Sequence, residues 1–245
     1  MLVMCGNSPA ANPPGKPVEE FFAEDMAVRM IKTLTQTTVG QKVLMAVTGL
    51  ILFLFILGHL SGNLLIFAGR EHMNEYAHFL HEHPKFLWPA RIVLLFCFFV
   101  HIVAAARLWL KNRSAREEGY TIYLPIETTI AARTMIYGGA AIFFFLLWHL
   151  LHLTFGVVGP RFDPNDVYGN VVRGFQNPAI AGIYLVGVAC LCAHLYHGAW
   201  SLLHTLGLSA PEIDCAKKKA ARILAVLIGL GYASIPLAVL TGVVR

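Results

Sequence analysis

Four histidines are the residues of this chain whose type and spacing could do chemistry. His59, His101, His149 and His197 each lie inside a different long apolar stretch, one histidine to a stretch. An imidazole in hydrocarbon loses its hydration and must find a partner there, and imidazole is the commonest metal ligand among side chains. Four of them at comparable positions in successive stretches therefore predict two metal centres, each held by two histidines.

The composition places these histidines in a membrane. Hydrophobic residues make up 57% of the chain and charged residues only 13%, and the mean hydropathy is +0.62. An ordinary globular domain is far less apolar. Five stretches have the ~20 apolar residues that a helix needs to cross a bilayer. They are 40–67, 87–110, 131–157, 178–206 and 221–243. The predicted fold class is an all-α bundle of five transmembrane helices, four of which carry the histidines.

The beginning of the chain differs from the rest. It holds several prolines and an acidic cluster at 19–25, too many charges for a signal peptide. We expect residues 1–37 to form an amphipathic or irregular arm in the cytoplasm and residues 38–245 to form one membrane domain.

Charge predicts the orientation of the bundle. Thirteen of the 19 lysines and arginines fall in the leader and in the second-to-third and fourth-to-fifth connections. Positive charge stays on the cytoplasmic side. We therefore expect a multi-pass protein of the bacterial cytoplasmic membrane, with its amino terminus inside and its carboxyl terminus outside. The net charge of +5 is explained by membrane topology and calls for no nucleic-acid partner.

This orientation sorts the histidines by depth. The first and third helices run outward and reach His59 and His149 late, so this pair belongs to the outer half of the membrane. The second and fourth helices run inward and reach His101 and His197 past their midpoints, which places this pair in the inner half. An up-and-down bundle lets each pair share a metal. Two imidazoles on opposite faces of one iron leave no open position, which suits electron transfer.

Two alternatives stay open at this stage. His152 lies three residues after His149, and His194 lies three before His197, so each neighbours the same helical face. Spacing alone allows either neighbour to be the ligand. A lone imidazole in a transmembrane helix is more often a hydrogen-bond partner than a ligand, but four with consistent pairing favour metal binding.

Small residues recur near the face of each histidine. Positions about ten or eleven residues earlier return to nearly the same side of a helix, roughly 16 Å away. Each helix could offer this small surface to a porphyrin bound at the other depth, or the small residues could simply allow close helix packing. The residues at these positions are Thr48, Gly49, Ala90, Gly138, Gly139 and Gly187.

Three segments carry a family resemblance. Residues 40–49 (GQKVLMAVTG) lead into 58–63 (GHLSGN), residues 133–135 (RTM) lead to 148–152 (WHLLH), and residues 194–201 read HLYHGAWS. Together they resemble the dihaem cytochrome b anchor subunit of succinate dehydrogenase and fumarate reductase, over about residues 38 to 243.

The resemblance implies a single-chain, five-helix anchor with two bis-histidine b haems. Such an anchor holds a flavoprotein and an iron–sulfur subunit on the cytoplasmic face. It exchanges electrons with a membrane quinone, usually menaquinone. The resemblance does not specify the oligomeric state of the complex. Carried over by motif, the ligands are His59, His101, His149 and, through its His-Gly step, His197. Leu195 stands where some fumarate-reducing relatives have a glutamate, which favours succinate oxidation.

Quinone chemistry needs proton donors or acceptors beside an apolar pocket. The end of the first helix and the connection that follows it are rich in such groups, which suggests a quinone site near the outer haem. One alternative is that this connection forms a solvated interfacial helix, and another is that the quinone binds at an inner site near the iron–sulfur partner. The candidate quinone-binding residues are Ser61, Asn63, Glu71, Asn74 and His78.

Three arginines near helix ends are candidates for the haem propionates: Arg91, Arg107 and Arg133. Arginines that extend towards the membrane surface are equally expected at such positions. The chain has no C-x-x-C-H motif, so its haems would be bound non-covalently. It also has no nucleotide-binding glycine loop, which places the flavin on a partner subunit.

Two other functions fit the same pattern. One is the dihaem subunit of another membrane oxidoreductase, such as a hydrogenase or formate dehydrogenase, which the co-purifying partner would distinguish. The other is a haem-free transporter or assembly protein, which would lack the visible absorption of b haems.

Overall fold

The structure, a computed structural model, describes residues 18–114, 130–205, 207 and 211–245. Every regular element in these ranges is a helix. The helices are α1 (Val18–Gln36), α2 (Thr38–Asn63), the short 3-10 helix η1 (Leu64–Ala68), α3 (Arg70–Glu82), α4 (Pro84–Ser114), α5 (Ile130–Leu153), α6 (Val167–Phe175), α7 (Pro178–Thr205) and α8 (Pro211–Leu240).

Five helices are long and apolar enough to cross a membrane, as the sequence predicts. They are α2, which continues into η1, followed by α4, α5, α7 and α8. The prediction of an all-α membrane fold is thereby confirmed. The expected start of the fifth span at residue 221 was late, because α8 begins at Pro211. Its first turns also form helix, since the lysines and alanines at 216–221 are good helix formers.

Local sequence signals set several of the helix ends. Proline is the first residue of α4, α7 and α8, where its missing N–H costs no hydrogen bond. Thr37 caps α2 by accepting a hydrogen bond from the Gly40 amide at 2.9 Å. At Gly69, φ is +105°, a conformation open to glycine that turns the chain between η1 and α3.

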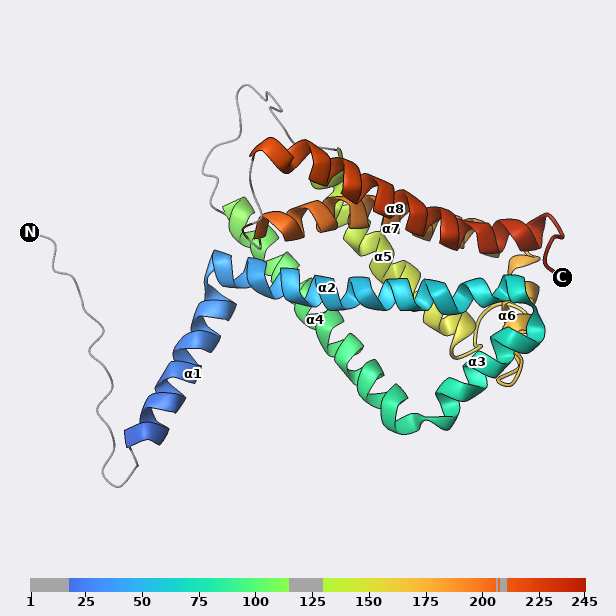
Figure 1. Ribbon diagram of the computed structural model, residues 1–245, viewed down its shortest axis with the longest axis horizontal. Coiled ribbons are helices and arrows are strands. Elements are labelled where there is room, and N and C mark those ends of the chain that lie inside the picture. Colours follow the sequence, from blue (N-terminus) through green and yellow to red (C-terminus); the bar gives the residue numbers. More distant parts are fainter. Residues whose placement is uncertain (1–17, 115–129, 206, 208–210) are drawn as a thin grey trace, which may run out of the picture.

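The long helices form one bundle with a helical cap at one end (Figure 1). α7 packs against α5 and α8, and α2 packs against α4, α7 and α8. The end of α4 lies close to the start of α2, whereas the start of α4 lies far from the end of α2. α3 spans that gap. α3 and α6 contact each other at the end of the bundle near the carboxyl terminus, while α1 projects from the opposite end.

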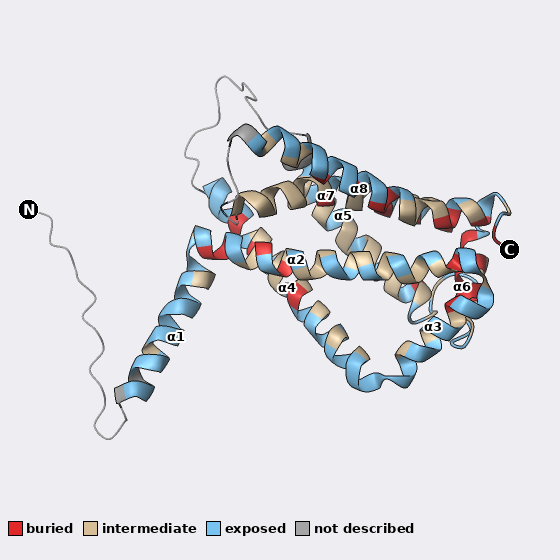
Figure 2. Cartoon of the chain, in the orientation of Figure 1, coloured by how far each residue is buried: buried red, intermediate tan, exposed pale blue. Residues whose placement is uncertain are grey.

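Burial is concentrated at the capped end, along the α7–α8 contact and where the first half of α2 packs on α4 (Figure 2). Most of α6 is buried in one apolar cluster with Ile66, Met73, Ala181 and Tyr184. A second cluster joins Leu195 of α7 to α8. The outward faces of the long helices keep their large apolar side chains exposed, as expected for surfaces in contact with lipid.

Candidate metal centres

One pair of histidines meets near the capped end. The rings of His59 in α2 and His149 in α5 lie with their centroids 5.8 Å apart and their planes at 89°. Both line a cavity of about 130 Å³ together with Asn63 and with Asn170 of α6. The two histidines expected to share the outer centre are therefore neighbours in the structure.

A second pair meets deeper in the bundle. The rings of His101 in α4 and His194 in α7 have centroids 6.2 Å apart and planes at 60°. The Thr48 hydroxyl lies 3.2 Å from Nδ1 of His101 and donates its own proton to the Leu44 carbonyl at 2.7 Å. With its proton on the Leu44 carbonyl, the hydroxyl accepts from a protonated Nδ1 of His101, and in that tautomer the Nε2 lone pair is free for a metal.

The structure places His194, and not His197, opposite His101. The ring of His197 lies instead 5.9 Å from the ring of Trp200 on its own helix. Nδ1 of His194 and Nδ1 of His197 are both buried without a hydrogen-bond partner. The assignment of His197 as the fourth ligand stays a prediction, and the ring geometry favours the alternative, His194.

His152 has a separate environment from its neighbour His149. Its side chain is 3% exposed, and its Nδ1 lies 2.9 Å from the Tyr184 hydroxyl. The ring fills the space beside two glycines: a Cβ added to Gly159 or Gly174 would come within 2.7 or 2.6 Å of it. His152 therefore joins α5 to α6 and α7, while His149 faces His59.

Gly174→Ala is expected to destabilise the capped end. The new Cβ would collide with the His152 ring, and overpacking of this kind costs about 1–3 kcal/mol. We expect a lower midpoint of thermal unfolding in detergent. Gly182→Ala in α7 is the matched control, because its Cβ meets nothing within 4 Å. Equal midpoints for the two variants would contradict the packing role of His152.

Both ring pairs have the spacing of axial ligands. Two imidazoles that bind one metal from opposite sides, each nitrogen at about 2 Å, have ring centres about 6 Å apart. No three His, Cys, Asp or Glu side chains converge on a metal position within the described part of the chain. Two imidazoles per centre is the donor set of an iron whose other ligands come from a porphyrin, so the residues present fit haem.

The two pairs lie at different depths. The His101 ring contacts Thr48 and Gly49 on α2, and a Cβ on Gly49 would be 3.2 Å from it. His59 follows Thr48 on the same helix by eleven residues, about 16 Å of helical rise. On α5, a Cβ on Gly139 would meet His194 at 4.0 Å, ten residues before His149. Thr48, Gly49 and Gly139 therefore lie beside the other pair of histidines, as the spacing suggests, whereas a Cβ on Gly187 would meet Phe145 and one on Gly138 would meet nothing within 4 Å.

The chain is similar to the succinate dehydrogenase cytochrome b558 subunit of Bacillus subtilis (strain 168). The two are 24% identical over 156 residues, which are 64% of this chain and 73% of the relative. This match supports the succinate dehydrogenase cytochrome b family. No family model and no solved structure matches the chain.

The candidate quinone residues do not converge on one site. Asn63 lines the cavity beside the outer histidines and donates to the His59 carbonyl at 2.6 Å. Ser61 is exposed and donates to the Leu57 carbonyl. Glu71 and His78 are exposed on α3. The expected outer connection is thus a partly exposed interfacial helix, and Asn63 is the candidate that reaches the histidines.

The three candidate propionate arginines lie far from one another along the chain. Arg91 stacks on Trp88 at 5.2 Å, near the start of α4. Arg107 is exposed and lines a separate cavity beside α1 and α2. The side chain of Arg133 lies outside the described residues.

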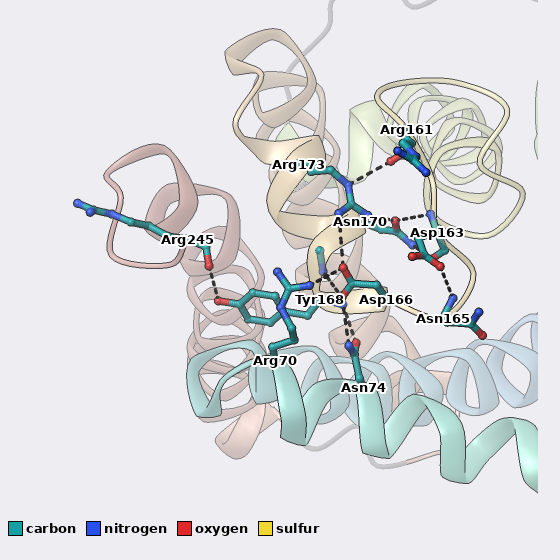
Figure 3. Close-up of polar contacts among 11 residues, drawn as sticks. Arg70, Asn74, Arg161, Asp163, Asn165, Asp166, Tyr168, Asn170, Arg173 and Arg245 are labelled. Atoms are coloured by element: carbon teal, nitrogen blue, oxygen red, sulfur yellow. Dashed lines mark hydrogen bonds and ion pairs between the residues drawn. The ribbon is translucent and has the colours of Figure 1, made fainter.

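A polar network that the sequence analysis missed holds the cap together (Figure 3). Asp166 forms ion pairs with Arg70 and Arg173, accepts from Asn74 at 3.1 Å and caps α6 through the Gly169 amide. The Asn74 oxygen accepts from the Tyr168 amide, so both ends of this candidate quinone ligand are engaged. The one local signal for the network is Asp166 at the start of a helix; its partners on α3 are more than 90 residues away.

Asp166→Asn is expected to weaken this cap in a pH-dependent way. Partial burial raises the pKa of Asp166, but hydrogen bonds from Asn74, Gly169 and Arg70 and the charge of Arg70 lower it more, to below the usual 3.8. The stabilisation is then fully present above the unfolded pKa of 3.8 and is lost as pH falls through the lower folded pKa. At pH 7 we expect a loss of about 1–3 kcal/mol of unfolding free energy.

Thermal unfolding of both forms between pH 3 and 8 checks this, since the deficit of the variant should narrow only at the acid end. Asp163→Asn is the control, because this exposed carboxylate accepts from the Asn165 amide and forms no ion pair within the part of the chain that the structure describes. A deficit independent of pH would show that charge at Asp166 is not what stabilises the cap.

Proposed function

We propose that this chain is the membrane cytochrome b subunit of a succinate dehydrogenase and that it binds two b haems. The observation that carries the proposal is the pair of facing imidazoles at each of two depths, with centroids 5.8 and 6.2 Å apart. The similarity to the cytochrome b558 subunit supports the same function. Five membrane-crossing helices provide the anchor.

The proposed ligands are His59 with His149 for the outer haem and His101 with His194 for the inner haem. His194 takes precedence over His197 because its ring faces His101. Thr48 is the positioning residue of the inner pair, since its hydroxyl lies 3.2 Å from Nδ1 of His101 and would stabilise the tautomer that leaves Nε2 free for a metal. His152 is excluded from the ligand set because Tyr184 and two glycines enclose its ring.

The ligand arrangement determines which chemistry the chain supports. When bound, a b haem supplies a centre that accepts and releases one electron. Each facing pair of histidines would hold one haem iron from both sides and so would keep oxygen and other small ligands from it. The positions of the pairs on α2 are about 16 Å apart along the helix, a spacing over which two bound haems would exchange electrons. This favours electron transfer across the membrane.

Partners and orientation complete the proposal. A flavoprotein and an iron–sulfur subunit would dock on the cytoplasmic face, at the end that carries α1 and the basic ends of α4 and α8. A quinone, with menaquinone as the expected species, would react near the outer haem. Asn63 is the best-placed candidate there because it lines the cavity beside His59 and His149; Ser61, Glu71 and His78 would act only if a quinone extends over the cap.

The purified complex tests the proposal directly. We expect a reduced-minus-oxidised spectrum of two b haems per chain, and a flavoprotein and an iron–sulfur protein among the co-purifying subunits identified by mass. A chain without b-haem absorption would contradict the proposal and indicate the transporter or assembly alternative. If two b haems are found together with hydrogenase or formate dehydrogenase subunits, the proposed haem sites stand, but the chain belongs to that other oxidoreductase.

A further inference from the structure

A second cavity lies outside the histidine pairs, in the elbow between α1, α2 and α4. Its volume is about 280 Å³, and its wall is formed by Thr35 of α1, by Gln41 and Leu44 of α2 and by one face of α4. His101 is not part of this wall. The cavity therefore opens on the side of α4 that faces away from the candidate metal centres.

The α4 wall is a long apolar groove. Its lining residues recur at helical spacing from Phe96 to Arg107, eleven residues or about 16 Å of helix. Phe96, Phe99 and Val103 are 66%, 55% and 45% exposed. Such a groove fits an extended hydrocarbon chain that lies along the helix from the bundle end towards the membrane interior.

The polar end of the cavity contains an unsatisfied acceptor. Gln41 is only 6% exposed, and its Nε2 donates to the Thr35 carbonyl at 3.0 Å. Its Oε1 is buried and has no hydrogen-bond partner. A buried acceptor without a partner is costly, and Gln41 lines the cavity. A ligand with an N–H or O–H group at this end would satisfy it.

A cation lies at the same level. Arg107 lines the cavity and is exposed. α4 runs antiparallel to α2, and the contact of His101 with Thr48 fixes their register, so Arg107 near the end of α4 is level with Gln41 near the start of α2. The site thus combines a guanidinium, a hydrogen-bond acceptor and a chain-length apolar groove.

We propose that this elbow binds one phospholipid. Its phosphate pairs with Arg107, a headgroup hydroxyl or amine donates to Gln41 Oε1, and one acyl chain follows the α4 groove from Val103 to Phe96. A phosphate matches the charge of arginine and its fork of donors, whereas an uncharged quinone does not. The headgroup would lie at the membrane boundary, where Arg107 is, and the chain would point inwards as in the surrounding leaflet.

Lipid retention tests the proposal on the full chain with whatever subunits accompany it. The complex is reconstituted in vesicles of phosphatidylcholine with phosphatidylglycerol and menaquinone, extracted in mild detergent and analysed by native mass spectrometry. We expect about one retained phosphatidylglycerol per chain. Arg107→Gln should lower this retention about tenfold, the effect of losing one charge-assisted contact.

Two further variants sharpen the test. Arg113→Gln is the matched control on α4, because this exposed arginine stacks on Trp109 outside the cavity and should retain the lipid. Val103→Trp fills the groove and should displace the lipid without changing any charge. This variant tests the proposed lipid site even if Arg107→Gln fails to fold. Retention of phosphatidylglycerol by Arg107→Gln or by Val103→Trp would overturn the proposal, as would menaquinone being the molecule that both variants lose.

Discussion

Replacing His59 with alanine is expected to leave the purified chain with one b haem where the unchanged chain holds two. Removal of one axial imidazole leaves His149 as the sole protein ligand of the outer iron, and alanine supplies no replacement donor. The inner pair is untouched, because it lies about 16 Å away along α2 and its ring contact involves α4 and α7. The haem content per chain, measured as the pyridine haemochrome, should therefore fall by half.

The partner variant makes this expectation specific. His149→Ala should remove the same haem, and the double variant should lose no more than either single one, because the two histidines act on one centre. His78→Ala is the control: this histidine is exposed on α3, and both haems should remain. Retention of two haems by His59→Ala would rule out His59 as a ligand, and loss of both haems only in the double variant would place the two residues at different centres.

Most of the fold could be predicted from apolar run lengths. A helix that crosses lipid must satisfy its own backbone and present apolar side chains outwards, so its sequence signal is strong and local. The same signal underestimates helices that extend beyond their apolar core: α8 begins at Pro211, and charged residues such as Lys217 lie in its first turns. Hydrogen bonding along a helix does not stop at the membrane boundary.

The cap could be predicted only in part. The sequence suggested an interfacial helix or a quinone site in the outer connection, and α3 is that helix, with Met73 buried beneath it. It could not show that Asn74 is engaged by Asp166 and Tyr168. These contacts join residues more than 90 positions apart, and a polar side chain in the sequence has the same appearance whether it binds a ligand or a distant loop.

The histidine pairs show where sequence reasoning ends. The depth of a residue follows from its position along the helix. Depth alone predicted that His59 pairs with His149 and that His101 pairs with a histidine of the fourth span. Rotation about the helix axis does not follow from depth. Leu195 packs against Ala225 and Ile228 of α8, and in this rotation of α7 the ring of His194 lies opposite His101 of α4.

The second decisive experiment therefore asks whether His194 or His197 is the fourth haem ligand. Three residues along a helix change the direction of a side chain by about 60°, enough to decide which imidazole reaches the partner of His101. We expect His194→Ala to lose the inner haem, as His101→Ala would, and to retain the outer one. His197→Ala should retain both haems, since its ring lies beside Trp200 and not opposite His101.

The two variants are matched controls for each other, because both remove from the same helix a partly buried imidazole whose buried Nδ1 has no hydrogen-bond partner. Any general loss of stability in α7 should then affect both, whereas loss of a ligand affects one. The reverse result, with the inner haem lost only in His197→Ala, would agree with the His-Gly motif and would require α7 to be turned by about 60° from its present packing. Since Leu195 packs against Ala225 in that arrangement, such a rotation would move Leu195 out of this contact, and labelling of a cysteine at position 195 with a membrane-permeant maleimide would detect the change.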